Sequence, residues 1–360
     1  MEQRLSRRTL LKLSSLGVVG VSLGRERPGG AQEKLSKITV VSYGGTWEKS
    51  VKENFVSCFR AKTGVAADVL VGSPDEWIQK IQATYQQRPA LDMLLSTSAG
   101  TVRAIRLGLV ERLDESLAPN LKDVPALFKE PFEGYAASFD GGSYGLAYNK
   151  ERVKNPPETW TEFVDRIVRG EFRNRVMWPH ISQTSGPEHL WWLAVTYGGD
   201  VNNVRPAFEK LRQMKSQILR FHMDVPSPGN ALIAGEIDVA LWPDGRLWGA
   251  VDGGAKHLSF RYLKPKTLMN TVEWMKVKNS PPITWEYLNC GFDPAAQEGF
   301  VKAFPGFFMT NRKVKYTPQQ LARLDATAAD FTFRNFAFAP YREIVPRIPE
   351  WLEQWNREIG

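Results

Sequence analysis

Short apolar runs alternate with helix-like segments at the start of the folded chain, and this alternation constrains the fold more than any other feature. Residues 38–42, 65–71 and 91–95 are typical of buried strands, and segments with helical spacing lie between them. This order and spacing predict a mostly parallel α/β sheet with right-handed crossovers. Such sheets bind ligands at the carboxyl ends of their strands, which are followed here by residues 43–46 and 96–98.

These two loops are small, carry hydroxyl groups and precede predicted helices. Backbone N–H groups at helix N-termini attract anions and carboxyl groups, so the loops are candidates for ligand contacts. Thr46 is expected to cap the helix over 47–63. The alternative, that both loops are simply capped turns, stays open at this stage.

A second α/β stretch follows in the remainder of the chain. Strands are predicted at 176–178, 237–242 and 272–277, with helices between them, and an amphipathic helix is predicted at 341–359. The chain has 360 residues, more than a single core usually organises. We therefore expect two lobes.

The N-terminal segment has the features of an export signal. Ser6 to Lys12 reads SRRTLLK, a twin-arginine motif, and small residues up to Ala31 are suitable for cleavage after that alanine. Residues 1–31 are therefore predicted to be a signal peptide, and the mature protein to be periplasmic. The apolar run 13–23 is too short to span a membrane, so we do not expect an embedded protein. The alternative is a basic amphipathic helix that the mature protein keeps.

Charge and cysteine content exclude several classes of protein. The chain has 47 basic and 39 acidic residues; without the six basic and two acidic residues of the signal segment, 41 and 37 remain, a net charge of +4. Charge of this size, with no basic run, does not indicate a nucleic-acid partner. Two cysteines, Cys58 and Cys290, exclude a disulfide scaffold but leave one bridge or two buried thiols open.

One short stretch has two incompatible interpretations. Residues 141–145, GGSYG, match the G-x-S-x-G pattern of a hydrolase nucleophile elbow, which would make Ser143 a nucleophile. An elbow needs a helix directly after the serine, whereas residues 144–148 favour extended structure. A secreted serine hydrolase is therefore only the alternative function, and we expect no catalytic residues.

The sequence contains no recognisable motif for a metal or a cofactor. Its four histidines share no ligand spacing, HExxH is absent, and the cysteines are far apart in sequence. Neither a phosphate-binding P-loop nor a dinucleotide-binding glycine pattern is present. We expect neither a metal nor a cofactor.

Four stretches together indicate a family. They are GLAYNK at 145–150 with PETW at 157–160, GEIDVA at 235–240, LNCGFDPAAQ at 288–297 and WLEQWN at 351–356. Through them the chain resembles extracellular solute-binding proteins of ABC importers, the branch that includes spermidine/putrescine-binding proteins. The resemblance covers nearly the whole chain after the signal segment.

The resemblance implies a bilobal α/β fold, the type II periplasmic binding protein fold, with two lobes joined by hinge strands. A monomer is expected, which captures a small-molecule ligand between its lobes and delivers it to the membrane permease of an ABC transporter. Ser143 then lies at a hinge, as a hydrogen-bonding or structural residue. The implied ranges are 37–141 and 269–325 for lobe 1, 149–262 and 326–360 for lobe 2, and 142–148 and 263–268 for the crossovers.

The same resemblance, with the strand-end loops, gives the candidate ligand contacts. Trp242 has a second interpretation as a core residue, because it ends a buried strand. The ten candidates are Tyr43, Thr46, Ser96, Ser98, Ser143, Ser185, Trp242, Asp244, Arg246 and Asn270.

The ligand class is inferred from two departures from the polyamine-binding pattern. Asn270 stands where that pattern has an acid, and Arg246 adds a fixed cation next to Asp244. A guanidinium favours carboxylate, phosphonate or sulfonate groups. The prediction is an anionic or zwitterionic metabolite, ahead of a polyamine. The alternative is that Arg246 points to solvent or pairs with Asp244.

Overall fold

The structure is a computed structural model, and it describes residues 37–360. The predicted twin-arginine motif and the cleavage site after Ala31 lie outside the described residues. Within the described chain, no helix combines the length and the apolar character needed to cross a bilayer.

The predicted alternation at the start of the chain is confirmed. The helix predicted over 47–63 is continuous but contains one π-helical segment. The elements are β1 (Lys37–Ser42), α1 (Thr46–Val51), η1 (Lys52–Val56), α2 (Ser57–Thr63), β2 (Ala66–Val71), α3 (Pro74–Thr84), β3 (Met93–Thr97) and α4 (Ser98–Arg106).

Local sequence explains where these helices begin and end. The prediction that Thr46 caps the first helix was wrong: Gly45, with φ 70°, occupies the capping position, and Thr46 is the first helical residue. A positive φ suits glycine far better than a β-branched threonine. Ser73 and Glu76 form a reciprocal capping box at the start of α3, and Gly64 ends α2 in the left-handed region.

The middle of the chain contains the longest strand and most of the second predicted α/β stretch. Strands β4, β6 and β8 were not predicted at these bounds. The elements are η2 (Pro119–Asp123), η3 (Ala126–Phe128), η4 (Glu130–Phe132), β4 (Ala137–Asn149), α5 (Trp160–Val168), β5 (Val176–Pro179), α6 (Gly186–Thr196), α7 (Arg205–Met214), η5 (Lys215–Gln217), β6 (Arg220–His222), α8 (Pro226–Ile233), β7 (Val239–Pro243), α9 (Asp244–Asp252) and β8 (Leu258–Arg261).

The last part of the chain returns to the first group of elements and ends in helices. The predicted C-terminal helix is present, with one short 3₁₀ turn inside it. The elements are β9 (Thr267–Lys276), α10 (Thr284–Gly291), α11 (Pro294–Val301), β10 (Phe308–Met309), α12 (Pro318–Leu321), α13 (Ala326–Ala329), β11 (Phe336–Ala337), α14 (Tyr341–Ile344), η6 (Val345–Arg347) and α15 (Ile348–Glu358).

The sheet is mixed, so the expectation of a mostly parallel sheet was wrong. Its main path among the described residues is β11-β9-β4-β7-β5-β6, with β3, β8 and β10 paired to the sides and β1-β2 as a separate parallel pair. Strand β4 is antiparallel to both β9 and β7. Strand β4 carries the chain from the first group of elements to the second and β9 carries it back, so the two must run in opposite directions.

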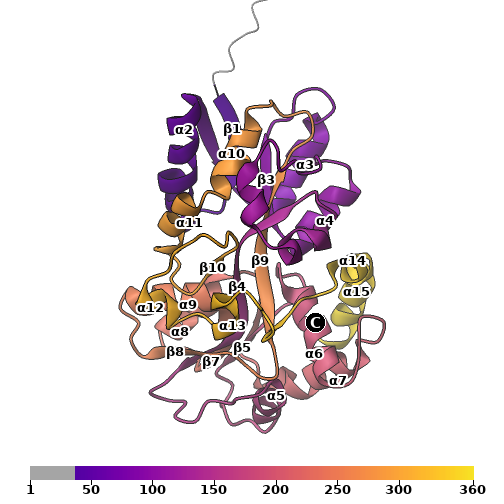
Figure 1. Cartoon of the computed structure of the whole chain (residues 1–360). Coiled ribbons are helices and arrows are strands. Elements are labelled where there is room, and N and C mark those ends of the chain that lie inside the picture. The colour runs from indigo at the N-terminus through magenta and orange to yellow at the C-terminus, as the bar shows by residue number, and fades with distance from the viewer. Residues whose placement is uncertain (1–36) are drawn as a thin grey trace, which may run out of the picture. The chain divides into compact units, whose positions relative to one another are not determined.

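Strand β4 changes its partners along its length. Residues 137–144 pair with β9, and residues 144–149 pair with β7 and β8. Figure 1 shows β4 and β9 running between an upper group of elements (β1, β3, α2, α3, α4, α10) and a lower group (β5, β7, β8, α5, α7, α9). The lobe and crossover boundaries given above remain a prediction.

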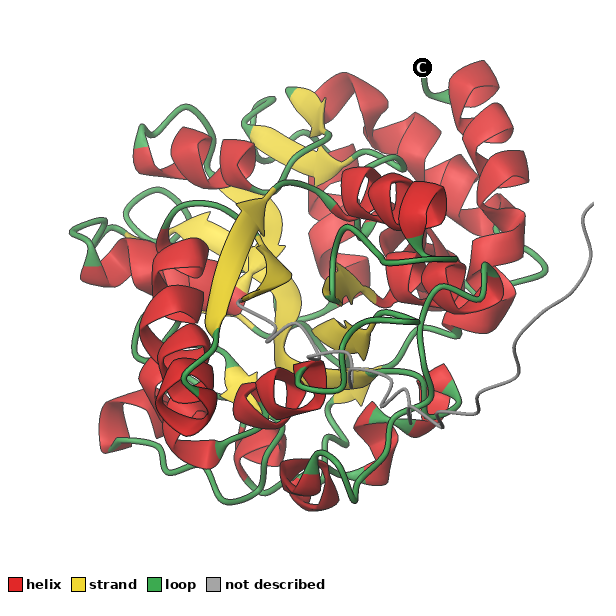
Figure 2. Cartoon of the chain, turned by 90° about the horizontal axis from the view of Figure 1, so that it is seen from above, coloured by secondary structure: helices red, strands yellow, loops and turns green. Residues whose placement is uncertain are grey.

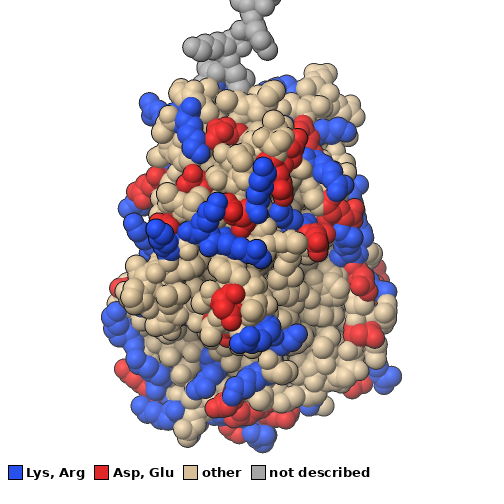
Figure 3. All heavy atoms as spheres, in the orientation of Figure 1, with Lys and Arg blue, Asp and Glu red and all other residues tan. Residues whose placement is uncertain are grey.

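Helices cover the strands on either side, as the view in Figure 2 shows. The C-terminal helices pack through Ile344, Trp351 and Trp355 into a core cluster that also contains Leu146 and Phe163. On the face drawn in Figure 3, basic and acidic side chains are interspersed. A surface of this kind is the usual solvated exterior of a globular protein.

The two cysteines form a disulfide bond. Cys58 of α2 and Cys290 of α10 are joined with a Cα–Cα distance of 5.9 Å and a sequence separation of 232. Of the two alternatives that the sequence left open, the bridge is the one that the structure contains.

Candidate ligand-binding cleft

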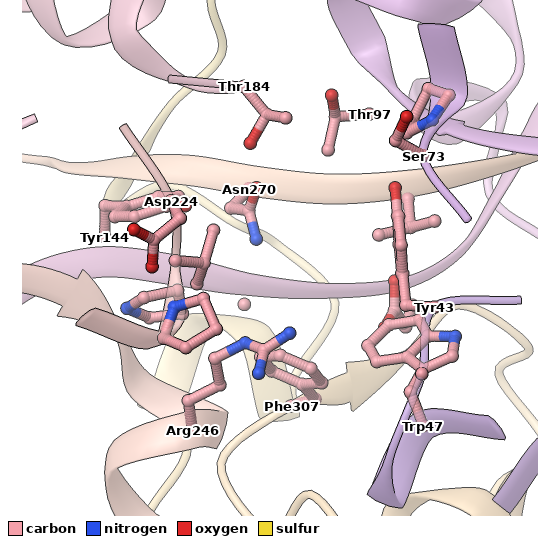
Figure 4. Close-up of a pocket in the computed structure, with 18 of the residues that line it drawn as sticks. Tyr43, Trp47, Ser73, Thr97, Tyr144, Thr184, Asp224, Arg246, Asn270 and Phe307 are labelled. Carbon is pink, nitrogen blue, oxygen red and sulfur yellow. The ribbon is translucent and has the colours of Figure 1, made fainter. Parts of the chain in front are cut away.

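A cleft of about 600 Å³ opens where several strands and helices end. This volume is in the range of small-molecule binding sites. Its wall is built from segments far apart in sequence, among them residues 43–47, 72–74, 140–144, 223–226 and 243–246. Figure 4 shows side chains from these segments directed into one space.

Four helices of eight or more residues begin at the wall of the cleft. Ser73 precedes α3, Thr97 precedes α4, Val225 precedes α8 and Pro243 precedes α9, and all four residues line the cleft. The first N–H groups of a helix have no partner within the helix and carry partial positive charge. The wall is therefore suited to negatively charged groups.

Arg246 supplies a full positive charge to the same wall. Its side chain comes from the first turn of α9, and Figure 4 shows its guanidinium and the Asn270 amide pointing into the cavity. Within the described part of the chain, Arg246 forms neither a hydrogen bond nor an ion pair, which sets aside its predicted alternative pairing with Asp244. Burial lowers the pKa of Arg246, while Tyr144 and Tyr43 act in the opposite direction.

Asp244 is buried behind the wall, and its carboxylate is already occupied. It accepts hydrogen bonds from the Ser143 N–H at 3.1 Å, the Ser143 hydroxyl at 2.9 Å, the Gly245 N–H at 2.7 Å and the Tyr262 hydroxyl at 3.2 Å. Burial raises the pKa of Asp244 to about 7, and these hydrogen bonds oppose the rise. The network fixes the start of α9 and so positions Arg246.

This network also bears on the nucleophile interpretation of Ser143. Its hydroxyl donates to a carboxylate, and no histidine is hydrogen-bonded to it among the described residues. A serine nucleophile needs an adjacent general base that accepts its proton. The position of Ser143 in the middle of β4 also lacks the strand-to-helix turn of an elbow.

Aromatic rings form much of the remaining wall. Tyr43, Trp47, Tyr144 and Phe307 line the cleft, and the Tyr43 and Trp47 ring centroids are 5.4 Å apart. Burial raises the pKa of both Tyr43 and Tyr144, so their hydroxyls stay neutral. The Tyr144 hydroxyl accepts a hydrogen bond from the Gln183 amide at 3.3 Å. These rings can contact the apolar parts of a ligand, and they can face a cation.

Three of the ten predicted contact residues line the cleft, namely Tyr43, Arg246 and Asn270. Thr46 is exposed at the start of α1. Trp242 lies in the core, where its indole N–H donates to the Val225 carbonyl at 2.7 Å. The structure thus places Trp242 according to its alternative interpretation.

The other predicted hydroxyl residues lie behind the wall rather than on it. Ser98 is buried and donates to Glu273 at 3.1 Å. Ser96 is fully buried next to it, and the Ser185 hydroxyl donates to Gln183 at 2.7 Å. Their neighbours in sequence face the cleft instead. Ser96 and Thr97 lie in β3, where successive side chains point to opposite sides, so an error of one residue moves a side chain off the wall. Ser98 begins α4 and Ser185 lies in the turn before α6, so this rule does not apply to them.

The sequence analysis missed several residues of the wall. Some had a local signal: Ser73 opens a capping box, and Thr97 and Thr184 are adjacent to predicted serines. Others, such as the aromatic residues of the wall, had none. The missed residues include Trp47, Ser73, Thr97, Asp140, Tyr144, Thr184, Asp224 and Phe307.

Comparison with known families identifies the chain. The model of the bacterial extracellular solute-binding protein family matches residues 54–329. The chain belongs to this family. The resemblance seen in the sequence is thereby confirmed at the level of the family, and the bilobal α/β fold class with it.

Solved structures have the same fold as this solute-binding protein. A protein from Bordetella parapertussis, described as a putative extracellular solute-binding protein, is 25% identical with a TM-score of 0.77, over 90% of this chain and 99% of that one. An ABC transporter protein from Clostridium perfringens is 21% identical with a TM-score of 0.74, over 90% and 100%. AgtB from A. tumefaciens R10, in complex with agropinic acid, is 18% identical with a TM-score of 0.70, over 90% and 99%. No curated protein matches the chain.

Proposed function

We propose that this protein is the periplasmic solute-binding component of an ABC importer. It captures an anionic or zwitterionic small metabolite in the cleft and delivers it to a membrane permease. The Arg7-Arg8 motif supports export by the twin-arginine pathway as part of this proposal. Membership of the extracellular solute-binding family supports the role.

Arg246 is the observation on which the ligand class rests. Its guanidinium lines the cleft without a protein partner among the described residues, next to a carboxylate that four donors already saturate. A partly buried cation without a counter-charge favours an acid group that can accept two parallel hydrogen bonds. A polyamine would add further positive charge beside it, so polyamines rank second.

The beginnings of α3, α4, α8 and α9 at the wall support the same class. The A. tumefaciens protein of the same fold binds agropinic acid, but at 18% identity that likeness concerns the fold. The ligand class must therefore be inferred from the side chains and helix ends of this cleft.

Thermal unfolding with a ligand panel tests this proposal. Polyamines, amino acids, dicarboxylates and phosphonates are each added to the purified protein. A ligand at 100 times its Kd adds about 2.7 kcal/mol to the unfolding free energy. For about 325 ordered residues this corresponds to a rise in Tm of about 4 °C. We expect acids to give the rise and polyamines to give none.

Variants of Arg246 give the specific readout. Arg246→Ala is expected to weaken binding of the acid at least about tenfold, and Arg246→Lys to restore part of it, because lysine keeps the charge and loses the bidentate geometry. Arg205→Ala is the matched control, since Arg205 is exposed on α7 and pairs with Glu209. A shift by acids that survives Arg246→Ala refutes the ligand class. A shift by polyamines alone refutes it too, while leaving the transport role.

A further inference from the structure

Asp140 is a buried acid of the cleft wall to which the described part of the protein supplies no donor. It lies in β4, its residue is 2% exposed, and it lines the cleft. Neither oxygen of its carboxyl group has a hydrogen-bond partner among the described residues. Buried polar atoms in folded proteins are nearly always hydrogen-bonded, and an unpaired buried acceptor is costly. This carboxyl group therefore lacks a donor that a ligand can supply.

The two buried carboxyl groups that act on Asp140, those of Asp244 and Glu273, receive their donors from the protein. Four donors saturate Asp244, as described above. Glu273 of β9 accepts hydrogen bonds from the hydroxyls of Ser98, Thr101 and Thr271, and a fourth from Ser138. Asp140 is thus the exception in a region where the protein otherwise supplies donors to its own buried acids.

Asp140 and Arg246 are not paired with each other. Both line the cleft, and Asp140 acts on Arg246 as a nearby charge without forming an ion pair with it. Among the described residues, one cleft therefore presents a cation without an ion-pair partner and an acid without a hydrogen-bond donor. A ligand that carries one acid group and one cationic group could satisfy both.

We propose that Asp140 accepts the hydrogen bonds of a ligand's ammonium group while Arg246 holds the acid group of the same molecule. This inference rests on the proposed function and narrows it to zwitterions. The rings of Tyr43, Trp47 and Phe307 line the same cleft and suit a positively charged group.

The charges around Asp140 indicate that binding of an ammonium group releases a proton from this carboxyl group. Burial raises the pKa of Asp140 well above its ordinary value, and the nearby Glu273 and Asp244 carboxyl groups raise it further. Arg246 and Tyr43 are the other titratable groups that interact with it. A raised pKa favours the protonated carboxyl, whereas the ammonium group of a ligand favours the carboxylate. Binding of R–NH₃⁺ then gives a carboxylate–ammonium pair, and the carboxyl proton leaves to solvent.

Paired probes test the inference by titration calorimetry. Each zwitterion is compared with the acid that lacks its amine: 4-aminobutyrate with butyrate, glutamate with glutarate, and leucine with 4-methylpentanoate. We expect at least one zwitterion to bind 10- to 100-fold more tightly than its partner. Asp140→Asn should remove this preference while the amine-free acid keeps its affinity. Titrations in two buffers of different ionisation enthalpy should show proton release with the zwitterion.

Glu188→Gln is the matched control. Glu188 is 3% exposed and carries an unpartnered oxygen, and it does not line the cleft, so the preference should persist in this variant. Proton release is measured on the unaltered protein. It therefore tests the role of Asp140 even if the Asp140→Asn variant fails to fold.

Four outcomes would overturn the assignment. They are equal binding of zwitterions and amine-free acids, binding without proton release, a preference that survives Asp140→Asn, and a preference removed by Asp224→Asn at the rim instead. If one of these outcomes occurs and the binding of acids still requires Arg246, the proposed function remains intact. Binding of neither kind of acid refutes the ligand class itself, and the Asp140 assignment with it.

Discussion

The buried carboxyl of Glu273 makes a quantitative prediction about stability and pH. Glu273 is 0% exposed, and its pKa rises from the ordinary value of 4.5 to about 8 because it is buried. Hydrogen bonds from Thr271, Thr101, Ser98 and Ser138 oppose this rise without cancelling it. The folded protein therefore holds a proton on Glu273 that the unfolded chain releases between pH 4.5 and 8.

The direction in which the unfolding free energy changes with pH follows from the number of protons bound in the folded and the unfolded state. The unfolding free energy falls with rising pH wherever the folded state binds more protons than the unfolded state. The contribution of Glu273 is fully present below pH 4.5 and is lost as the pH rises through the folded pKa of about 8. At about 1.4 kcal/mol for each pKa unit, the loss between pH 5.5 and 7.5 is about 2.5 kcal/mol.

Urea unfolding at pH 5.5, 6.5 and 7.5 measures this contribution. Glu273→Gln keeps the shape of the side chain and removes the titration. The unfolding free energy of the unaltered protein, measured relative to that of the variant, should fall by about 2 to 3 kcal/mol between pH 5.5 and pH 7.5. Glu350→Gln, an exposed residue of α15, controls for the loss of one glutamate. A difference between protein and variant that is constant across the three pH values would refute the reasoning.

Two further predictions concern the scaffold of the cleft. Replacing both Cys58 and Cys290 by serine should lower the unfolding free energy by about 2 to 5 kcal/mol, because the bridge closes a loop of 232 residues. Urea unfolding measures this loss. Equal stability of the variant and the parent would contradict the prediction. Gly142→Ala should lower the unfolding free energy by about 1 to 3 kcal/mol and weaken ligand binding. The added Cβ atom would lie 2.5 Å from Oδ1 of Asp244 and 2.7 Å from the Phe307 ring, so both side chains would have to move. Calorimetric binding and a melting curve check this second prediction, and a variant with unchanged affinity and Tm would contradict it.

The sequence allowed the regular elements to be predicted but not the pairing of the strands. Periodicity located β1, β2 and β3 to within two residues, because each is a short apolar run bounded by polar or small residues. It could not give the length of β4, since only residues 144–148 favour extended structure and glycine is unfavourable within a strand, as at 141, 142 and 145. Gly142 is required there because the start of α9 and the Phe307 ring pack against its backbone. Contacts from segments 100 or more residues away leave no local pattern.

The cleft was predicted less completely than the fold, for a related reason. The strand-end loops were located correctly, yet within the second loop the predicted Ser96 and Ser98 lie behind the wall and Thr97 lies on it. Sequence shows that a hydroxyl-rich loop precedes a helix, but it does not show which side chain of an extended segment faces outward. Arg246 could be placed on the cleft wall because it follows a predicted strand end, where sheets of this kind bind ligands.

Asp140 and Asp244 show what only the structure could add. Both are 2% exposed acids next to glycine, and their sequence contexts, SFDGG and WPDGR, do not separate them. They differ in how many donors reach each carboxyl group. Asp244 begins a helix, where the adjacent N–H and the crossing strand β4 supply donors. Asp140 lies within a strand whose N–H groups are directed to neighbouring strands, so its side chain meets the cleft instead. The number of donors around a buried acid, together with its place on the cleft wall, therefore distinguishes a structural carboxylate from one that a ligand can satisfy.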